Sequence, residues 1–437
     1  MAALSAERLS EGGKQMMASQ ESSARGQPAV EVAFVVLILA VTVLQRFGLN
    51  FGDYSLNAAL VAMFALLVVA GLTGVLTVSA ARLVLYGVCV GIALLSTLLN
   101  EQSSSVTSLA LLAVMYLPFV FVLTPAAGLS PQRANDIFLD VAAFCAVAGV
   151  AQFYAQFLFH ADWLFDFTPQ VPAFLRGPSG YNTVIRAGGS LKSNGFFFRE
   201  PSGFSFVMAL ALMLECLSHR RAVRIGFLGL ALLLTYSGTG LLALVIGLVI
   251  PMNGRNVLRL VVVGAVGAAF FFLLEEPLNL SFTMARLHEF GSETSSAYIR
   301  YIAPGRLIAD AAASAPSLLW LGHGPGTIFR QEVGYEFHDP TWAKLIFEYG
   351  VVGFVAFLAL FWASLGGPSA PTRVRAMLFA GWLIMGGHLL SPEQTFMTLA
   401  LLGLLPRPSA SPRDARAEVP SGLPPGVVGL RAQEVRS

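Results

Sequence analysis

Residues 201–250 read PSGFSFVMALALMLECLSHRRAVRIGFLGLALLLTYSGTGLLALVIGLVI and contain three apolar runs. The first run ends at the basic segment SHRRAVR, and the second ends at the small-residue segment SGTG. A helix needs roughly 20 apolar residues to cross the hydrocarbon of a bilayer. We therefore read the runs as membrane helices, the last two being short and either joined by a tight hairpin or forming one broken helix. This stretch predicts an all-α integral membrane protein.

The whole chain has the same character. Of its 437 residues, 56% are hydrophobic and 12% are charged, and the mean hydropathy is +0.70. Soluble domains carry about 25% charged residues, so lipid is the expected solvent. The net charge of +2 gives no indication of a nucleic-acid partner. The three cysteines lie in apolar runs and are expected to be core residues, without disulfides or a metal site; they are Cys89, Cys145 and Cys216.

Hydropathy extends this pattern to about twelve transmembrane helices. The expected spans are 30–46, 56–77, 82–99, 106–124, 136–158, 201–217, 223–236, 239–251, 256–274, 345–365, 375–390 and 394–405. Residues 29–405 then form a transmembrane domain. Residues 1–28 and the Pro/Gly-rich residues 406–437 are expected to be disordered tails on the cytoplasmic side.

Positive charges give the sidedness, because short cytoplasmic segments are enriched in lysine and arginine. Basic residues occupy alternate connections and the first tail, at Arg8, Lys14, Arg25, Arg82, Arg133, Arg220, Arg221, Arg224, Arg255, Arg259, Arg373 and Arg375. The short connections of the other side hold only Arg46. This asymmetry predicts cytoplasmic termini and two extended outer loops, at about 159–200 and about 275–344.

Both outer loops are rich in positive side chains. The first holds Arg176, Arg186, Lys192 and Arg199, and the second holds Arg286, Arg300, Arg306, Arg330 and Lys344. Guanidinium groups bind phosphate through two parallel hydrogen bonds and stay charged. They are therefore candidate ligands for the diphosphate of a lipid-linked substrate, whereas the alternative is pairing with lipid headgroups or nearby glutamates. Residues 297–313 have apolar residues at helical spacing, which predicts an amphipathic surface helix with a candidate break at Pro304 and Gly305.

His338 and Asp339 directly precede an apolar helix that contains Glu348. A neutral imidazole at the mouth of a cavity can accept a proton from an attacking sugar hydroxyl. The alternative is that His338 caps the helix or contacts headgroups. Glu348 can orient a partner or hold an arginine. His388 and Glu393, near the last hairpin, are expected to face the same side of the membrane.

The segment LGHGPGT (321–327) contains three closely spaced glycines. A Gly-rich phosphate loop requires a strand before it and a helix after it, and that context is missing here. We interpret the segment as a turn that directs His323 and Thr327.

Four segments together resemble a known family. NGFFFREPSGFS (194–205), YSGTGLL (236–242), LGHGPGT (321–327) and HDPTWAKLIFEYGVVGF (338–354) occur in the order that is typical of the O-antigen ligase/polymerase superfamily, which includes the Wzy-type repeat-unit polymerases. The resemblance implies a multi-pass protein of the bacterial inner membrane with a large periplasmic loop. It also implies glycan transfer from an undecaprenyl diphosphate carrier to an acceptor hydroxyl, without a metal or another cofactor.

The resemblance also implies roles for single residues. Arg300 matches the arginine assigned to the carrier diphosphate, His338 matches the histidine that activates the acceptor, and either Arg186 or Lys192 matches the positive residue of the first loop. Further candidates are Arg199 and Arg306 for the diphosphate, and Asp339, Glu348 and His323 for support. Two features depart from the family. Asp339 follows the histidine where Asn, Ser or Gln is usual, and one extra residue separates this pair from Gly350. An extra residue turns a helix by about 100°, which would redirect His338 unless a loop absorbs it.

The resemblance leaves three functions open. The His–Asp pair departs from the stricter ligase pattern, so we favour a polymerase of exopolysaccharide, capsule or O-antigen over a glycan ligase. A transporter or flippase is the third alternative, although transporters usually bind their substrates near the bilayer midplane. The expected partners are the undecaprenyl-diphosphate-linked oligosaccharide, membrane lipids, and a flippase and chain-length regulator of the same pathway.

Overall fold

The computed structural model describes residues 27–51, 54–159, 162–177, 184–187, 189–251, 265, 295–365, 370–385 and 389–405. The chain divides into two units, Met1–Pro406 and Arg407–Ser437, and every described residue lies in the first. Except for residues 27 and 28, the two expected tails lie outside the described residues. So do Arg286, His388 and, except for residue 265, the expected span 256–274.

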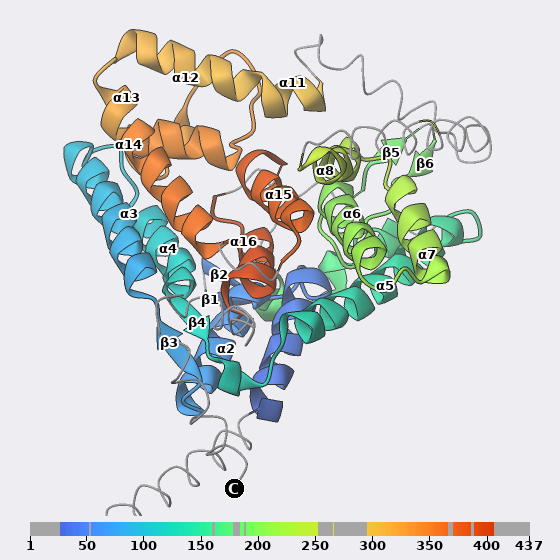
Figure 1. Ribbon diagram of the computed structural model, residues 1–437. Helices are drawn as coiled ribbons and strands as arrows, with labels where there is room; N and C mark the ends of the chain where they lie inside the picture. The colour runs from blue at the N-terminus through green and yellow to red at the C-terminus, as the bar shows by residue number, and fades with distance from the viewer. Residues whose placement is uncertain are drawn as a thin grey trace, which may run out of the picture. The chain divides into compact units, whose positions relative to one another are not determined.

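The described part of the chain is mostly helical, as expected (Figure 1). The α-helices are Gln27–Thr42, α2 (Ala58–Leu72), α3 (Ala80–Leu99), α4 (Val106–Tyr116), α5 (Pro131–Ala155), α6 (Pro201–Leu217), α7 (Ala222–Leu233), α8 (Gly238–Val249), α11 (Ser296–Tyr301), α12 (Ala303–Ser314), α13 (Leu318–Leu321), α14 (Thr341–Ser364), α15 (Thr372–Ala380) and α16 (Pro392–Thr398). Short 3₁₀ turns occupy Leu117–Val120, Pro125–Ala127, Asp162–Leu164, Thr168–Gln170, Ala173–Leu175 and Ile328–Arg330, and π-helical turns occupy Gly381–Met385 and Leu399–Gly403.

The described strands are short and pair in antiparallel twos. They are β1 (Gly48–Phe51) with β2 (Tyr54–Asn57), β3 (Leu76–Val78) with β4 (Phe121–Leu123), and β5 (Arg186–Ala187) with β6 (Ser190–Leu191). They lie in connections between helices. Helices are therefore the main secondary structure of the described residues, as the hydropathy pattern predicts.

Within the described ranges, three helices are long and apolar enough to cross a membrane, namely α3, α5 and α14. The other apolar helices of the described part have 10–17 residues, and at 1.5 Å per residue they are shorter than the hydrocarbon layer of roughly 30 Å. A membrane protein is thus supported, whereas the expected twelve spans are not confirmed. Exposed apolar residues such as Val84 and Leu98 of α3, 66% and 65% accessible, fit contact with lipid.

Residues 234–237 separate α7 from α8, so the last three residues of SGTG belong to α8, and both helices pack against α6. A Cβ at Gly240, at the start of α8, would collide with the backbone of Ser205 on α6. Helices in lipid gain little from the hydrophobic effect, so close backbone approach at small residues supports their packing. The small residue Gly240 of the SGTG segment therefore allows α8 to approach α6 closely.

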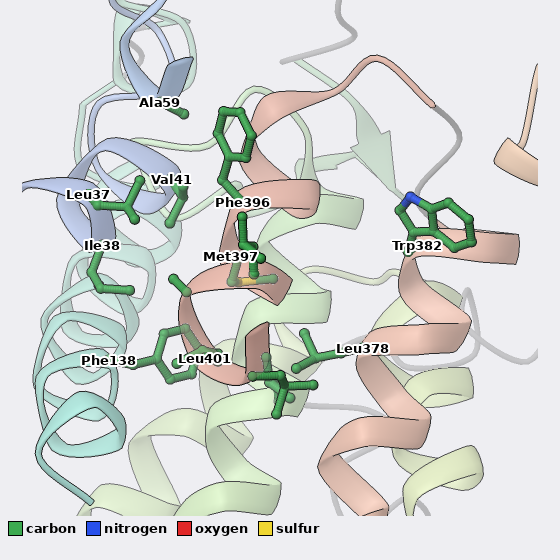
Figure 2. Packing of buried hydrophobic residues seen from close by; sticks show 14 of the residues in the cluster. Leu37, Ile38, Val41, Ala59, Phe138, Leu378, Trp382, Phe396, Met397 and Leu401 are labelled. Carbon is green, nitrogen blue, oxygen red and sulfur yellow. The ribbon is translucent and has the colours of Figure 1, made fainter. Parts of the chain in front are cut away.

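The core joins helices that are distant in the sequence. Figure 2 shows Leu37, Ile38 and Val41 of the first described helix facing Phe396 and Met397 of α16. All five side chains are at most 2% accessible. This packing anchors α16 beside the first described helix, so that the start of α16 lies near the end of that helix.

One of the expected core cysteines differs from the prediction. Cys89 and Cys145 are buried, whereas Cys216 is exposed near the end of α6. The apolar run continues to the end of this helix, but in its last turn Leu214 and Glu215 are buried whereas Cys216 and Leu217 are exposed. The position of a cysteine within an apolar run of the sequence therefore did not determine whether its side chain is buried.

Candidate functional site

A cavity lies where the first described helix ends and where α6, α14 and α16 begin. Its polar wall includes Arg199, Glu200, Arg300, His338 and Glu393. Its apolar wall includes Val41, Phe206, Val207, Ile384, Met385 and Met397. Residues with two guanidinium groups, two carboxylates and an imidazole therefore line one space together with apolar side chains.

Arg199 is held on two sides. It lies just before Pro201, which begins α6 and which suits a first helical turn because it needs no N–H partner there. Its Nε donates to the Gln45 carbonyl oxygen at 2.7 Å. Its Nη2 lies 2.9 Å from Glu393 Oε1, and both side chains are only 8% accessible.

Glu393 is in turn fixed by polar neighbours. Its Oε1 accepts a hydrogen bond from Asn57 Nδ2 at 2.6 Å, and its Oε2 accepts one from Ser391 Oγ at 3.0 Å. Buried charges are stable only when they are paired and hydrogen-bonded. The carboxylate therefore holds the Arg199 guanidinium in one orientation. The expectation that Glu393 faces the outer-loop side agrees with its position on the cavity.

Arg300 has a looser counter-ion. Its Nη2 lies 3.5 Å from Glu200 Oε2, and the side chains are 25% and 27% accessible. Glu200 also accepts a hydrogen bond from Ser202 Oγ at 2.8 Å. Pairs that are partly exposed contribute about 0–1 kcal/mol. An anionic ligand can therefore replace Glu200 at Arg300 more easily than it can replace Glu393 at Arg199.

His338 lies in the loop before α14 and is exposed at the cavity. Its backbone N–H donates to the Ile299 carbonyl oxygen at 3.0 Å, which ties it to the residue before Arg300. Helix α14 starts only after Pro340 and has a non-helical residue at Gly350. His338 lines the cavity, so the extra residue between the His–Asp pair and Gly350 does not turn it away from this space.

Asp339 and Glu348 belong to a buried ionic cluster. Lys344 Nζ lies 3.1 Å from Asp339 Oδ2 and 3.9 Å from Glu348 Oε1, and all three side chains are at most 3% accessible. Lys344 Nζ also lies 4.0 Å from the centre of the Phe329 ring. These residues are not among the described residues that line the cavity. They link the start of α14 to the preceding loop, and a supporting role for Asp339 and Glu348 stays a prediction.

The glycine-rich turn packs against the break in α14. The N–H groups of His323 and Gly324 donate to the Phe347 and Glu348 carbonyl oxygens at 2.9 and 3.0 Å. Gly322 and Gly350 have φ of 78° and 70°, and a Cβ on either would collide with backbone of the other segment. The His323 ring stacks on Phe347 with 4.4 Å between the ring centres. The turn therefore directs His323 onto α14.

Three of the predicted diphosphate ligands lie elsewhere among the described residues. Arg186 is exposed in β5, Lys192 is buried after β6, and the Arg306 guanidinium lies 4.5 Å from the centre of the Tyr335 ring. The cavity lining of the described ranges does not include them. Of the predicted ligands in the first loop, Arg199 lines the cavity together with Arg300 and His338. Binding roles for Arg186, Lys192 and Arg306 stay predictions.

Sequence reasoning did not single out Glu200. The sequence feature that indicates Glu200 is its place directly between Arg199 and the start of an apolar span. A carboxylate so close to the membrane is a functional candidate by default. No group of three or more His, Cys, Asp or Glu that could hold a metal occurs within the described ranges. Reaction without a metal stays a prediction.

The apolar helices and the polar cavity at their ends define a membrane protein with a site suited to an anionic, partly apolar ligand. The family model of the WcaD colanic acid polymerase matches residues 32–405, and the chain belongs to this family. The resemblance to Wzy-type polymerases is thereby confirmed. The protein is a membrane glycosyltransferase that polymerises exopolysaccharide repeat units from a lipid-linked oligosaccharide. No curated protein and no solved structure matched the chain.

Proposed function

We propose that the polymerase performs its transfer in this cavity, with Arg199 and Arg300 binding the diphosphate of an undecaprenyl-linked glycan and His338 acting as the base. The observation that supports this most is the convergence of the three side chains on one space from three separate segments. Two guanidinium groups match the charge and the hydrogen-bond geometry of a diphosphate. The apolar wall beside them suits the first carbons of a polyprenyl chain.

The proposed step is an inverting displacement. The acceptor hydroxyl oxygen attacks the anomeric carbon of the donor sugar, and His338 accepts the hydroxyl proton. The bond between that carbon and the diphosphate oxygen breaks, and its electron pair leaves with the polyprenyl diphosphate. Arg199 and Arg300 stabilise the negative charge that develops on the leaving group, an effect that is usually the largest contribution to rate.

The two carboxylates of the cavity have different proposed roles. Glu393 stays on Arg199, because their pair is buried and supported by Asn57. Glu200 leaves Arg300 when the diphosphate binds, because that pair is long and partly exposed. One arginine then acts as a fixed ligand, and the other changes its partner on binding.

The proposed location is the bacterial inner membrane, with the cavity on the periplasmic side and both termini in the cytoplasm. The positions of positively charged side chains support this orientation. At the opposite end of the bundle, Arg82 donates to the Gly403 carbonyl oxygen at 2.8 Å, and Arg224 lies 2.9 Å from Asp140. These arginines, in the first turns of α3 and α7, thus lie at the end away from the cavity, as the positive-inside rule requires of the cytoplasmic side.

Cysteine labelling tests this orientation. Two exposed alanines lie at opposite ends of the bundle, Ala173 in the first outer loop and Ala222 at the start of α7. They would be replaced by cysteine one at a time in a Cys216→Ser background. We expect a membrane-impermeant maleimide to label Ala173→Cys in intact spheroplasts, and to label Ala222→Cys only after permeabilisation. The reverse pattern would place the cavity in the cytoplasm and contradict the proposal.

Deletion of the gene tests the activity in the cell. We expect single repeat units to accumulate on the polyprenyl carrier, in a form that periplasmic glycosidases can reach, and the wild-type gene to restore polymer. Long chains on the carrier would instead indicate a ligase. Single repeats that only permeabilised cells expose to glycosidases would indicate a flippase.

A further inference from the structure

Arg46 lies outside the cavity, in the turn beyond the helix Gln27–Thr42, and is only 2% accessible. Its Nη1 donates to Asp166 Oδ1 at 2.6 Å and to Thr168 Oγ1 at 3.2 Å. Its Nη2 donates to the Phe165 and Phe198 carbonyl oxygens, both at 2.7 Å. One buried guanidinium therefore joins the first described helix, the first outer loop and the residue before Arg199.

The contacts of Arg46 and Arg199 are reciprocal. Arg46 donates to the carbonyl oxygen of Phe198, the residue that precedes Arg199. Arg199 donates through Nε to the carbonyl oxygen of Gln45, the residue that precedes Arg46. Each arginine thus fixes the backbone that carries the other, and movement of Arg46 must alter the position from which Arg199 enters the cavity.

Charge explains why Asp166 is part of this arrangement. Burial lowers the pKa of Arg46 to about 10, the nearby positive charge of Arg199 lowers it as well, and Asp166 raises it. The guanidinium remains protonated at neutral pH. Asp166 therefore compensates one of two neighbouring cations, and it remains 31% accessible and partly hydrated.

We propose that Arg46 is a positioning residue that fixes Arg199 as a preformed ligand for the donor diphosphate. The inference rests on the proposed role of Arg199. A binding group that is already held in its bound orientation loses less conformational freedom when the ligand arrives. Arg199 is held at Nε through Gln45, at Nη2 through Glu393, and at its backbone through Arg46 and Phe198.

The test is a double-mutant cycle on the purified full-length protein in nanodiscs, with farnesyl diphosphate as the probe and its Kd measured by calorimetry. We expect Arg199→Met and Arg46→Met each to weaken binding by about tenfold, and the double variant to bind no more weakly than Arg199→Met alone. The matched control is Arg176→Met. Arg176 also joins parts of the first loop, donating to the Pro169 and Val171 carbonyl oxygens at 3.1 Å, and its loss is expected to leave Kd unchanged.

The outcomes separate the inference from the proposed function. Additive losses in the double variant, or a normal Kd for Arg46→Met when Arg199→Met binds weakly, would overturn the positioning role. An equal loss in Arg176→Met would also overturn it, because any disturbance of the loop would then suffice. A normal Kd for Arg199→Met would instead remove the proposed role of Arg199. If Arg46→Met aggregates on size exclusion, Arg46→Lys takes its place, since it keeps the charge but cannot reach both carbonyl oxygens.

Discussion

Replacing Arg300 with alanine is expected to lower the rate of polymerisation by about 10²–10³-fold, the loss that follows when one donor to a developing anion is removed. Arg300 lies on the cavity and its counter-ion Glu200 is exchangeable, so its guanidinium is the one that gains the most from the leaving diphosphate. The measurement is polymer formation by membranes supplied with carrier-linked repeat units, normalised to the amount of inserted protein.

Two variants make the Arg300 result specific. Arg300→Lys keeps the charge but loses bidentate geometry, and we expect an intermediate rate. Arg330→Ala removes an arginine of the same outer loop that donates to the Ser103 carbonyl oxygen at 2.7 Å, and it should polymerise normally. Normal polymer from Arg300→Ala, or an equal defect in Arg330→Ala, would refute a diphosphate role for Arg300.

The helices were largely predictable, because apolar runs and their interruptions are local. The expected span 201–217 coincides with α6, and the amphipathic segment 297–313 is helical. The expected break is present, because the segment forms two helices, α11 and α12, which meet at Ile302, two residues before Pro304. Pro304 lies in the first turn of α12, where proline begins a helix more readily than it continues one. Arg300 and Arg306 consequently belong to different helices. Of these two described residues, Arg300 lines the cavity and Arg306 does not.

The partners of the site could not be predicted in the same way. Arg199, Arg300 and His338 were candidates because of their chemistry and their place in the outer loops. Their supports come from far along the chain: Asn57 and Glu393 are 336 positions apart, and Arg46 and Phe198 are 152 apart. Helical periodicity reports which residues share a face, but not which helix ends meet. The sequence of any one segment therefore does not indicate a buried network to which four segments contribute.

The contrast between Arg199 and Lys192 shows the same limit. Both precede α6 in the first loop and both are buried, yet only Arg199 lines the cavity among the described residues. Between them, Gly195 and Phe196 have φ of 67° and 66°, in the left-handed region. The Phe198 N–H also donates to the Asn194 carbonyl oxygen at 3.2 Å, so the chain turns between Asn194 and Phe198. A loop that turns in this way separates neighbouring charges that look equivalent in the sequence.

Replacing His338 with alanine is expected to lower the rate by about 10²–10⁴-fold, the usual contribution of a general base. The side chain is exposed at the cavity, and its backbone is bound to the residue before Arg300, so a proton acceptor is held beside the proposed diphosphate ligands. Single repeat units should remain on the carrier. The Kd for farnesyl diphosphate should stay unchanged, because a base that acts on the acceptor does not hold the donor diphosphate.

The control for His338 is His323→Ala. His323 is the histidine of the glycine-rich turn, it is stacked on Phe347, and it does not line the cavity among the described residues. We expect this variant to keep most of its activity. Added imidazole should partly restore polymerisation to His338→Ala, because the small base can occupy the space that the side chain leaves, whereas a residue that only shapes the loop would not respond. Wild-type polymer from His338→Ala would exclude the histidine from the chemistry. A low rate that imidazole does not change, together with weaker binding of farnesyl diphosphate, would assign it to donor binding instead.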